Sequence, residues 1–262
     1  MADAASEPRP PSPWLLLMEG GRAPLEYAAT MALMPWLSRL PAGDGHPVIV
    51  FPGLGASELS TRPLRDFLGR LGYAVYDWGL GRNRPRGGVL QDCRERVLEV
   101  AGKHGRKVSL VGWSLGGVYA RELAKALQPQ VRCVVTLGSP FSGHVRATNV
   151  SYAYELYSGR PLQHDAQRAE RLKRAPTVPT TSIYSRTDGV VAWQCSVNDE
   201  QPHTENVEIH ASHLGLGVNP LALYVIADRL RQDPQHWQRF DARAVPRWPW
   251  RGGTAAQAQA GH

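Results

Sequence analysis

A serine flanked by glycines is the residue of this sequence best placed to do chemistry. Ser114 stands at the centre of the pentapeptide Gly-Trp-Ser-Leu-Gly at 112–116, between a β-branched run at 107–111 and a helix-forming run at 118–127. A strand that turns sharply into a helix presents the serine hydroxyl at the end of a sheet, and glycines let the backbone fold tightly there. The free amides at the start of that helix can bind an oxyanion. The pattern predicts a nucleophilic serine.

A serine hydroxyl needs a base, and the base needs a group that orients it. Candidates for both roles follow later in the chain. A predicted strand at 180–185 ends just before Asp188, which Gly189 follows, and a predicted strand at 206–210 ends just before His213. The three polar residues therefore occur in the order Ser, Asp, His, each just past a strand. We interpret His213 as the general base and Asp188 as the residue that orients it.

Other residues compete for these two roles. His210 ends the last strand and is the rival base, but His213 lies in the loop before the next predicted helix. Asp199 and Glu200 are rival acids in a polar stretch that is typical of a solvated connection. Asp188 could also serve only to cap a turn.

Short segments around these residues resemble the α/β-hydrolases and, within them, the bacterial lipases and esterases. The segments are Gly138-Ser139-Pro140 with Gly143, Asp188-Gly-Val-Val191 and Ser212-His213. The resemblance covers roughly residues 46–232 in order. It implies an α/β-hydrolase fold with Ser114, Asp188 and His213 as catalytic residues.

The expected oxyanion hole consists of two backbone amides. Leu115 directly follows the serine, and Leu54 lies in the loop at 52–55 after a predicted strand at 48–51. This loop departs from the His-Gly-Gly-Gly form of one esterase group. The resemblance therefore favours the plain Gly-x type of loop.

Apolar residues flank the predicted catalytic groups, which favours a hydrophobic acyl site. The expected substrate-binding residues are Trp113, Phe141, Trp193 and Leu214. Trp113 could instead pack against the sheet. We predict a serine carboxylic-ester hydrolase, an esterase or lipase that acts on a hydrophobic ester through an acyl-enzyme intermediate. The same residues would serve a thioesterase or an acyltransferase. A hydrolase-fold protein that binds a ligand without turnover is the non-enzymatic alternative.

The elements that must position these residues alternate between strand and helix from residue 46 onward. This alternation predicts an α/β fold, with a mostly parallel sheet covered by helices on both faces. The predicted strands are 48–51, 73–77, 107–111, 131–137, 180–185 and 206–210. The predicted helices are 60–71, 89–101, 115–127 and 220–231.

We expect one hydrolase domain at 46–240, preceded by a disordered segment at 1–13 and followed by a mobile tail at 241–262. The resemblance implies a small helical cap or lid at 141–178, although this stretch could also be a surface excursion. The helical segment at 14–45 is expected to pack against the core in place of the usual leading strands. The alternative is an amphipathic flap that touches lipid or shields the active site.

Charge and cysteine content narrow the set of partners. The chain has 30 Lys and Arg against 23 Asp and Glu, a net charge of +7, but its basic residues are scattered. We therefore expect a solvated basic surface and no nucleic-acid binding, with peripheral contact to a membrane or lipid surface left open.

The three cysteines lack metal-ligand spacing, and Asp188 and Asp199 form no calcium loop, so we predict no metal and no cofactor. Cys93 and Cys195 could pair.

The first thirteen residues are acidic and rich in proline. They show no basic start before an apolar core, which a secretory signal peptide would need. We therefore expect a cytoplasmic location.

Overall fold

Six parallel strands form a single sheet in the computed structural model, which describes residues 8–142, 148–149 and 166–245. The strand order is β2-β1-β3-β4-β5-β6. The strands are β1 (Pro47–Phe51), β2 (Ala74–Asp77), β3 (Val108–Trp113), β4 (Val131–Leu137), β5 (Thr180–Tyr184) and β6 (Thr204–Glu208). The predicted parallel sheet is confirmed, since every predicted strand is present with its ends displaced by two residues at most.

Helices cover both faces of this sheet. They are α1 (Pro13–Leu37), α2 (Arg62–Arg70), α3 (Val89–His104), α4 (Leu115–Ala126), α6 (Ala166–Lys173) and α7 (Pro220–Leu230). Short 3-10 helices are η1 (Glu58–Thr61), η2 (Trp193–Ser196), η3 (Pro234–His236) and η4 (Ala242–Ala244). The predicted helix at 60–71 begins as η1 and continues as α2.

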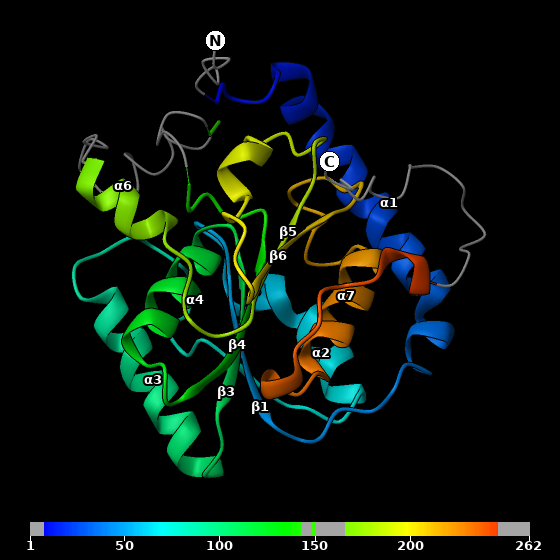
Figure 1. Ribbon diagram of the computed structural model, residues 1–262. Coiled ribbons are helices and arrows are strands. Elements are labelled where there is room, and N and C mark those ends of the chain that lie inside the picture. The colour runs from blue at the N-terminus through cyan, green and yellow to red at the C-terminus, as the bar shows by residue number, and fades with distance from the viewer. Residues whose placement is uncertain (1–7, 143–147, 150–165, 246–262) are drawn as a thin grey trace, which may run out of the picture.

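The core divides into two layers, one on each face of the sheet. On one face, Val48 and Val50 of β1 pack with residues of α2 and α7. On the other face, Ile49 and Phe51 pack with residues of α3 and α4. Figure 1 shows α3 and α4 on one side of the strands and α2, α7 and α1 on the other. Because both faces are covered, β1 is a continuous apolar run rather than an alternating one.

Helix α1 packs along α7 at its C-terminal end. Trp36 stacks on Tyr224 of α7 with ring centroids 5.7 Å apart, and Leu37 is fully buried. Ser12 caps the other end of the helix, where its hydroxyl accepts a hydrogen bond from the Leu15 amide at 3.3 Å. None of the helices in the described ranges is long and apolar enough to cross a membrane.

Most of the expected cap lies outside the described residues, as do residues 1–7 and 246–262. What is described of the cap includes α6, which lies against α4. The Lys125 ammonium of α4 donates to the carbonyl of Arg171 at 2.5 Å, and Arg121 donates to the carbonyl of Lys173 at 3.0 Å. The cap over the pocket, the disordered start and the mobile tail stay predictions.

Candidate active site

The turn between β3 and α4 holds Ser114 in a strained conformation. Ser114 has φ 53° and ψ −122°, and it is the one non-glycine residue with positive φ in the described part of the chain. Such conformations cost free energy and concentrate at functional sites. The turn is also tight, because a Cβ on Gly116 would lie 2.6 Å from the carbonyl oxygen of Pro52 at the end of β1. The sequence pattern around Ser114 therefore folds as the strand, turn and helix that a nucleophilic serine requires.

A buried histidine and aspartate form a hydrogen-bonded pair near this turn. His213 Nδ1 lies 2.7 Å from Asp188 Oδ2, and both side chains are almost fully buried. The other oxygen of Asp188 accepts hydrogen bonds from the amides of Val190 and Val191, each at 2.8 Å. The carboxylate is therefore fixed on both sides, and it holds the imidazole in one orientation. With Nδ1 committed to Asp188, Nε2 is the nitrogen that is left for another partner.

The surroundings of His213 favour its protonated form. Burial by itself would lower the pKa of His213, because it disfavours the charged imidazolium. The negative charge of Asp188, its hydrogen bond to Nδ1 and, to a smaller extent, the charge of Glu19 outweigh this effect. The pKa of His213 therefore lies above its ordinary value.

The end of β4 links the serine turn to the histidine–aspartate pair. The Ser114 amide donates to the carbonyl of Leu137 at 2.8 Å. The next residue, Gly138, has φ +52°, and a Cβ there would lie 3.0 Å from Asp188 Oδ2 and 3.1 Å from His213 Nδ1. The three residues predicted to be catalytic therefore come together around the carboxyl end of β4.

Trp113 links the serine turn directly to the histidine loop. Its indole Nε1 donates to the carbonyl of His213 at 3.0 Å, and the two rings lie 6.4 Å apart between centroids. This contact gives Trp113 a place in the framework of the site, close to the residue expected to act as base.

The rivals weighed from the sequence lie elsewhere. His210 is exposed, and Asp188 pairs with His213 instead. The side chains of Asp199 and Glu200 are 61% and 83% exposed and form ion pairs at the surface. The geometry therefore favours Asp188 and His213 over these alternatives.

The loop after β1 lies beside the serine. A Cβ on Gly53 would be 3.4 Å from Ser114 Cβ, which brings the following residue, Leu54, close to the turn. The amides of Leu54 and Leu115 donate no hydrogen bond to any group that the structure describes. They are therefore free to bind an oxyanion near Ser114.

Asn83 holds this loop and was not among the predicted site residues. It is fully buried, its side-chain nitrogen donates to the carbonyl of Pro52 at 2.7 Å, and its backbone carbonyl accepts from the Gly55 amide at 2.8 Å. A single asparagine far along the chain carries no local signal for this role.

The predicted substrate-binding residues have different surroundings. Leu214 is 46% exposed next to His213. Phe141 is buried beneath the guanidinium of Arg121, which lies 3.6 Å from its ring centroid. Trp193 stacks on Tyr184 of β5 at 5.7 Å. Leu214 and Trp113 thus flank the histidine, whereas Phe141 and Trp193 pack against other side chains.

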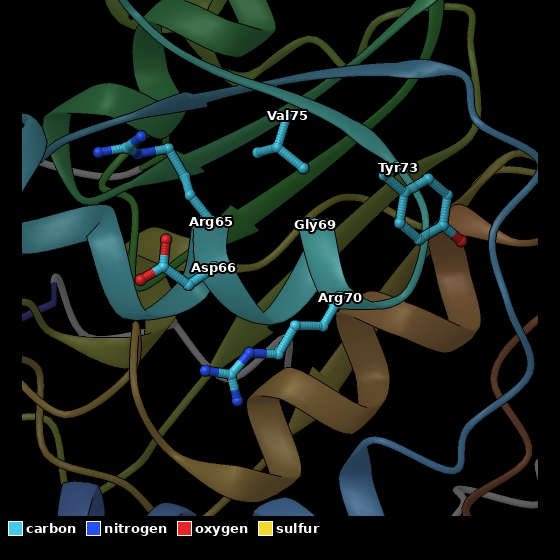
Figure 2. A pocket seen from close by; sticks show the side chains of 6 residues that line it. All are labelled: Arg65, Asp66, Gly69, Arg70, Tyr73 and Val75. Atoms are coloured by element: carbon cyan, nitrogen blue, oxygen red, sulfur yellow. The ribbon is translucent and has the colours of Figure 1, made fainter.

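A surface hollow of about 510 Å³ lies away from these residues, along α2 and β2. Figure 2 shows that Arg65 and Arg70 point in different directions there instead of converging on one point. Arg65 is already engaged, because it donates to the carbonyl of Glu58 at 2.9 Å. The hollow therefore lacks the convergent polar groups of a ligand site.

Three charged residues of α1, Glu19, Arg22 and Glu26, were not among the predicted site residues. All three point inward and form hydrogen bonds with the loops that carry Asp188 and His213. Their spacing of three and four residues places them on one face of an otherwise apolar helix. That spacing is the signal that could have identified them.

Within the described residues, no group of three or more His, Cys, Asp or Glu side chains could hold a metal ion. All three cysteines are buried and free, so the pairing of Cys93 with Cys195 considered from the sequence is not formed. Cys93 and Cys195 belong to different hydrophobic clusters, which keeps the two sulfurs apart.

Residues 48–262 match the model of the alpha/beta hydrolase family, which covers most of the chain. This chain therefore belongs to the alpha/beta hydrolase family. No curated protein matches the sequence.

Solved lipases and esterases share the fold at low sequence identity. Aspergillus fumigatus lipase B has a TM-score of 0.56 at 20% identity over 76% of this chain and 57% of its own chain. Bacillus licheniformis lipase BlEst2 has a TM-score of 0.56 at 16% identity, over 74% of this chain and 95% of its own. Pyrococcus furiosus esterase Pf2001 has a TM-score of 0.54 at 17% identity, over 70% of this chain and 81% of its own. This chain thus spans little more than half of the Aspergillus lipase, and these likenesses support the α/β-hydrolase fold.

Proposed function

We propose that this protein is a serine carboxylic-ester hydrolase that acts on a hydrophobic ester through an acyl-enzyme intermediate. The observation that carries the proposal is the buried hydrogen bond between His213 and Asp188, next to the strained turn of Ser114. A buried aspartate that orients a histidine beside such a serine is the arrangement of a nucleophilic triad.

In the proposed reaction, Ser114 Oγ attacks the ester carbonyl carbon while His213 Nε2 takes the hydroxyl proton. Asp188 stabilises the imidazolium that forms. The histidine then gives its proton to the leaving alcohol, and the C–O bond of the ester breaks. Water attacks the resulting acyl-serine with His213 again as base, which releases the carboxylic acid and restores the free serine.

The proposed oxyanion hole is formed by the amides of Leu54 and Leu115. Neither amide donates to another group in the described part of the chain, and they come from two different segments near Ser114, one after β1 and one at the start of α4. Loss of one such donor typically costs about 3 kcal/mol of transition-state stabilisation. The side chains of these two residues matter less than the positions of their backbones.

The proposal of a hydrophobic ester draws on two observations. The solved proteins that share this fold include lipases and esterases. Trp113 and the partly exposed Leu214 place apolar surface next to His213. We propose Trp113 and Leu214 as the substrate-binding residues nearest to the chemistry, whereas Phe141 and Trp193 pack against Arg121 and Tyr184.

The outward face of α1 favours contact with a lipid surface. Trp14, Leu17 and Leu25 are 67%, 71% and 71% exposed, whereas the charged residues of this helix point inward. We propose that this face lies on the aggregate that supplies the ester. Leu25→Ser should weaken cosedimentation with anionic phospholipid vesicles, whereas Leu59→Ser, at a leucine of η1 that is 67% exposed, should not. Equal binding by both variants would contradict the proposed contact.

The test of the proposed function is turnover of p-nitrophenyl esters from acetate to palmitate by the native protein and by Ser114→Ala. We expect turnover that requires Ser114. The acyl chain length of the best substrate will distinguish a small-ester esterase from a long-chain lipase. Full turnover by Ser114→Ala would refute the proposal. A native protein that neither hydrolyses these esters nor reacts with a fluorophosphonate at Ser114 would contradict the proposal and favour the ligand-binding alternative.

A thioesterase or an acyltransferase would form the same acyl-serine and differ in what receives the acyl group or in the bond that is cleaved. Product analysis with added alcohol or amine acceptors separates transfer from hydrolysis. Turnover of a thioester that carries the same acyl group as the oxygen ester distinguishes a thioesterase from an esterase. We expect water to be the acceptor and the oxygen ester to be the better substrate.

A further inference from the structure

A buried carboxylate on α1 binds backbone amides from two loops at once. Glu19 is 3% exposed. One of its oxygens accepts from the Gly189 amide at 2.8 Å and from the His213 amide at 2.9 Å, and the other accepts from the Leu214 amide at 2.9 Å. Gly189 directly follows Asp188. A single side chain therefore joins the loop of the expected acid to the loop of the expected base.

The loop that follows Asp188 lies very close to this helix. A Cβ on Gly189 would lie 2.5 Å from the carbonyl carbon of Leu15 and 2.7 Å from the amide nitrogen of Leu16, so the loop touches the backbone of α1. No residue other than glycine fits at this contact. The position of Asp188 is therefore set by α1 as well as by the end of β5.

The neighbouring charged residues of α1 extend the contact on both sides. Arg22 donates to the carbonyl of Thr187 at 2.6 Å and to its hydroxyl at 2.9 Å. Glu26 accepts from the Ser212 amide at 2.7 Å and from the Asn219 side chain at 3.0 Å. Each group thus has hydrogen-bond partners that offset the cost of its burial.

We propose that Glu19 is a positioning residue of this site: it fixes the separation of Asp188 and His213 through the amides beside them, and its charge stabilises the imidazolium formed when His213 takes the proton of Ser114. This inference rests on the proposed function. An apolar residue at position 19 would leave the amides of Gly189, His213 and Leu214 without this acceptor, so the carboxylate is what holds the two loops at a fixed separation.

The charged groups that act on His213 are Asp188, from the loop after β5, and Glu19, from α1. Arg22 and Glu26, the other charged residues of α1, bind Thr187 and Ser212 instead. The negative charge of Glu19 contributes to raising the pKa of His213. Its removal should therefore lower that pKa, which moves the acid limb of kcat/KM to lower pH, because activity requires the neutral imidazole.

The test compares Glu19→Gln with Glu26→Gln as a matched control on the same helix. Glutamine keeps the size of the side chain but loses the charge and turns one acceptor into a donor. We expect Glu19→Gln to lower kcat/KM at the pH optimum by roughly 10- to 100-fold, because small displacements of catalytic groups cost this much. We also expect its acid limb to move to lower pH, whereas the acid limb of Glu26→Gln should stay in place.

Measurements of kcat/KM against pH, of the rate of fluorophosphonate labelling at Ser114 and of Tm distinguish positioning from stability. If Glu19→Gln lowers Tm but keeps the native acid limb and labelling rate, Glu19 has only a structural role and the inference is overturned. If Glu19→Gln does not fold, Glu19→Asp serves instead. It keeps the charge but shortens the side chain, so the rate should fall while the acid limb stays near its native position. A native rate in Glu19→Asp would overturn the inference.

Failure of the proposed function has a different signature. In that case the native protein shows no activity that depends on Ser114 and no labelling there. Failure of the inference alone leaves a native enzyme that is active and labelled at Ser114, with Glu19→Gln equal to it in acid limb and labelling rate.

Discussion

His213 Nδ1 lies 2.7 Å from Asp188 Oδ2, and the second oxygen of Asp188 is held by the amides of Val190 and Val191. One oxygen of the aspartate is thus occupied by two amides, and the other faces the imidazole. This arrangement fixes which nitrogen of His213 faces the rest of the site. The pair can act on Ser114 only through Nε2, which is the basis of the predictions that follow.

Asp188→Asn should lower kcat on the order of 10³- to 10⁴-fold, because an amide does not hold the imidazole in the required tautomer. Ester turnover beside Tm checks this. The matched control is Asp199→Asn, at the exposed rival acid that pairs with Lys173, which should keep native turnover. Similar losses in both variants would contradict the assignment of Asp188.

Activity should fall as the pH is lowered, with an apparent pKa above the ordinary histidine value. The pKa of His213 is raised, against the effect of burial, by the charge and hydrogen bond of Asp188 and by Glu19. The base must be neutral to take a proton, so the acid limb of kcat/KM reports this pKa. An acid limb below the ordinary histidine value would contradict the assignment of His213 as the base.

The same pKa shift links stability to pH. The folded protein binds the His213 proton more tightly than the unfolded chain does, so the pair adds stability at pH below the ordinary histidine pKa. That contribution is lost as the pH rises through the raised pKa of the folded state. His213→Gln should remove this part of the pH dependence of unfolding, which denaturant titrations across the range will measure.

Gly138→Ala should impair both stability and activity. Its φ of +52° costs a side chain about 1–2 kcal/mol. Its Cβ would also lie 2.7 Å from a Leu216 methyl and 3.0 Å from Asp188 Oδ2. Gly105→Ala is the control, since Gly105 has φ +58° with nothing within 4 Å of a Cβ. We expect Gly105→Ala to have a lower free energy of unfolding but native turnover. Gly138→Ala should be lower in both. Equal effects would show that the contact with the pair is unimportant.

Gly189→Ala should separate α1 from the loop of Asp188, because its Cβ would lie 2.5 Å from the carbonyl carbon of Leu15. We expect a loss of about 1–3 kcal/mol in the free energy of unfolding, as for overpacked cores, together with reduced turnover. Gly21→Ala on the same helix meets no atom within 4 Å and should stabilise by roughly 0.5–1 kcal/mol. Denaturant unfolding of both variants checks the pair, and a stable, active Gly189→Ala would contradict this close contact.

The strands of the sheet and their succession along the chain follow from local sequence. The run at 48–51 is apolar throughout and the run at 131–137 is mostly apolar, because parallel strands are buried on both faces, and their limits can be read within two residues. The turn at Ser114 is also local, since the glycines, the preceding strand and the following helix are contiguous. The expectation that Asp188 and His213 act together was available because both residues directly follow strands of one sheet.

Other features depend on contacts between segments far apart in the sequence, which no local pattern encodes. Glu19 meets Gly189 and His213 across 170 and 194 residues, and Asn83 reaches the carbonyl of Pro52 across 31. The strands, the helices and the residues able to do chemistry could be predicted from the sequence, because these depend on periodicity and backbone preference. The folded structure was needed to show that Trp113 holds the histidine loop and that the charged residues of α1 face inward. Those choices depend on which buried amides lack a partner once the chain has folded.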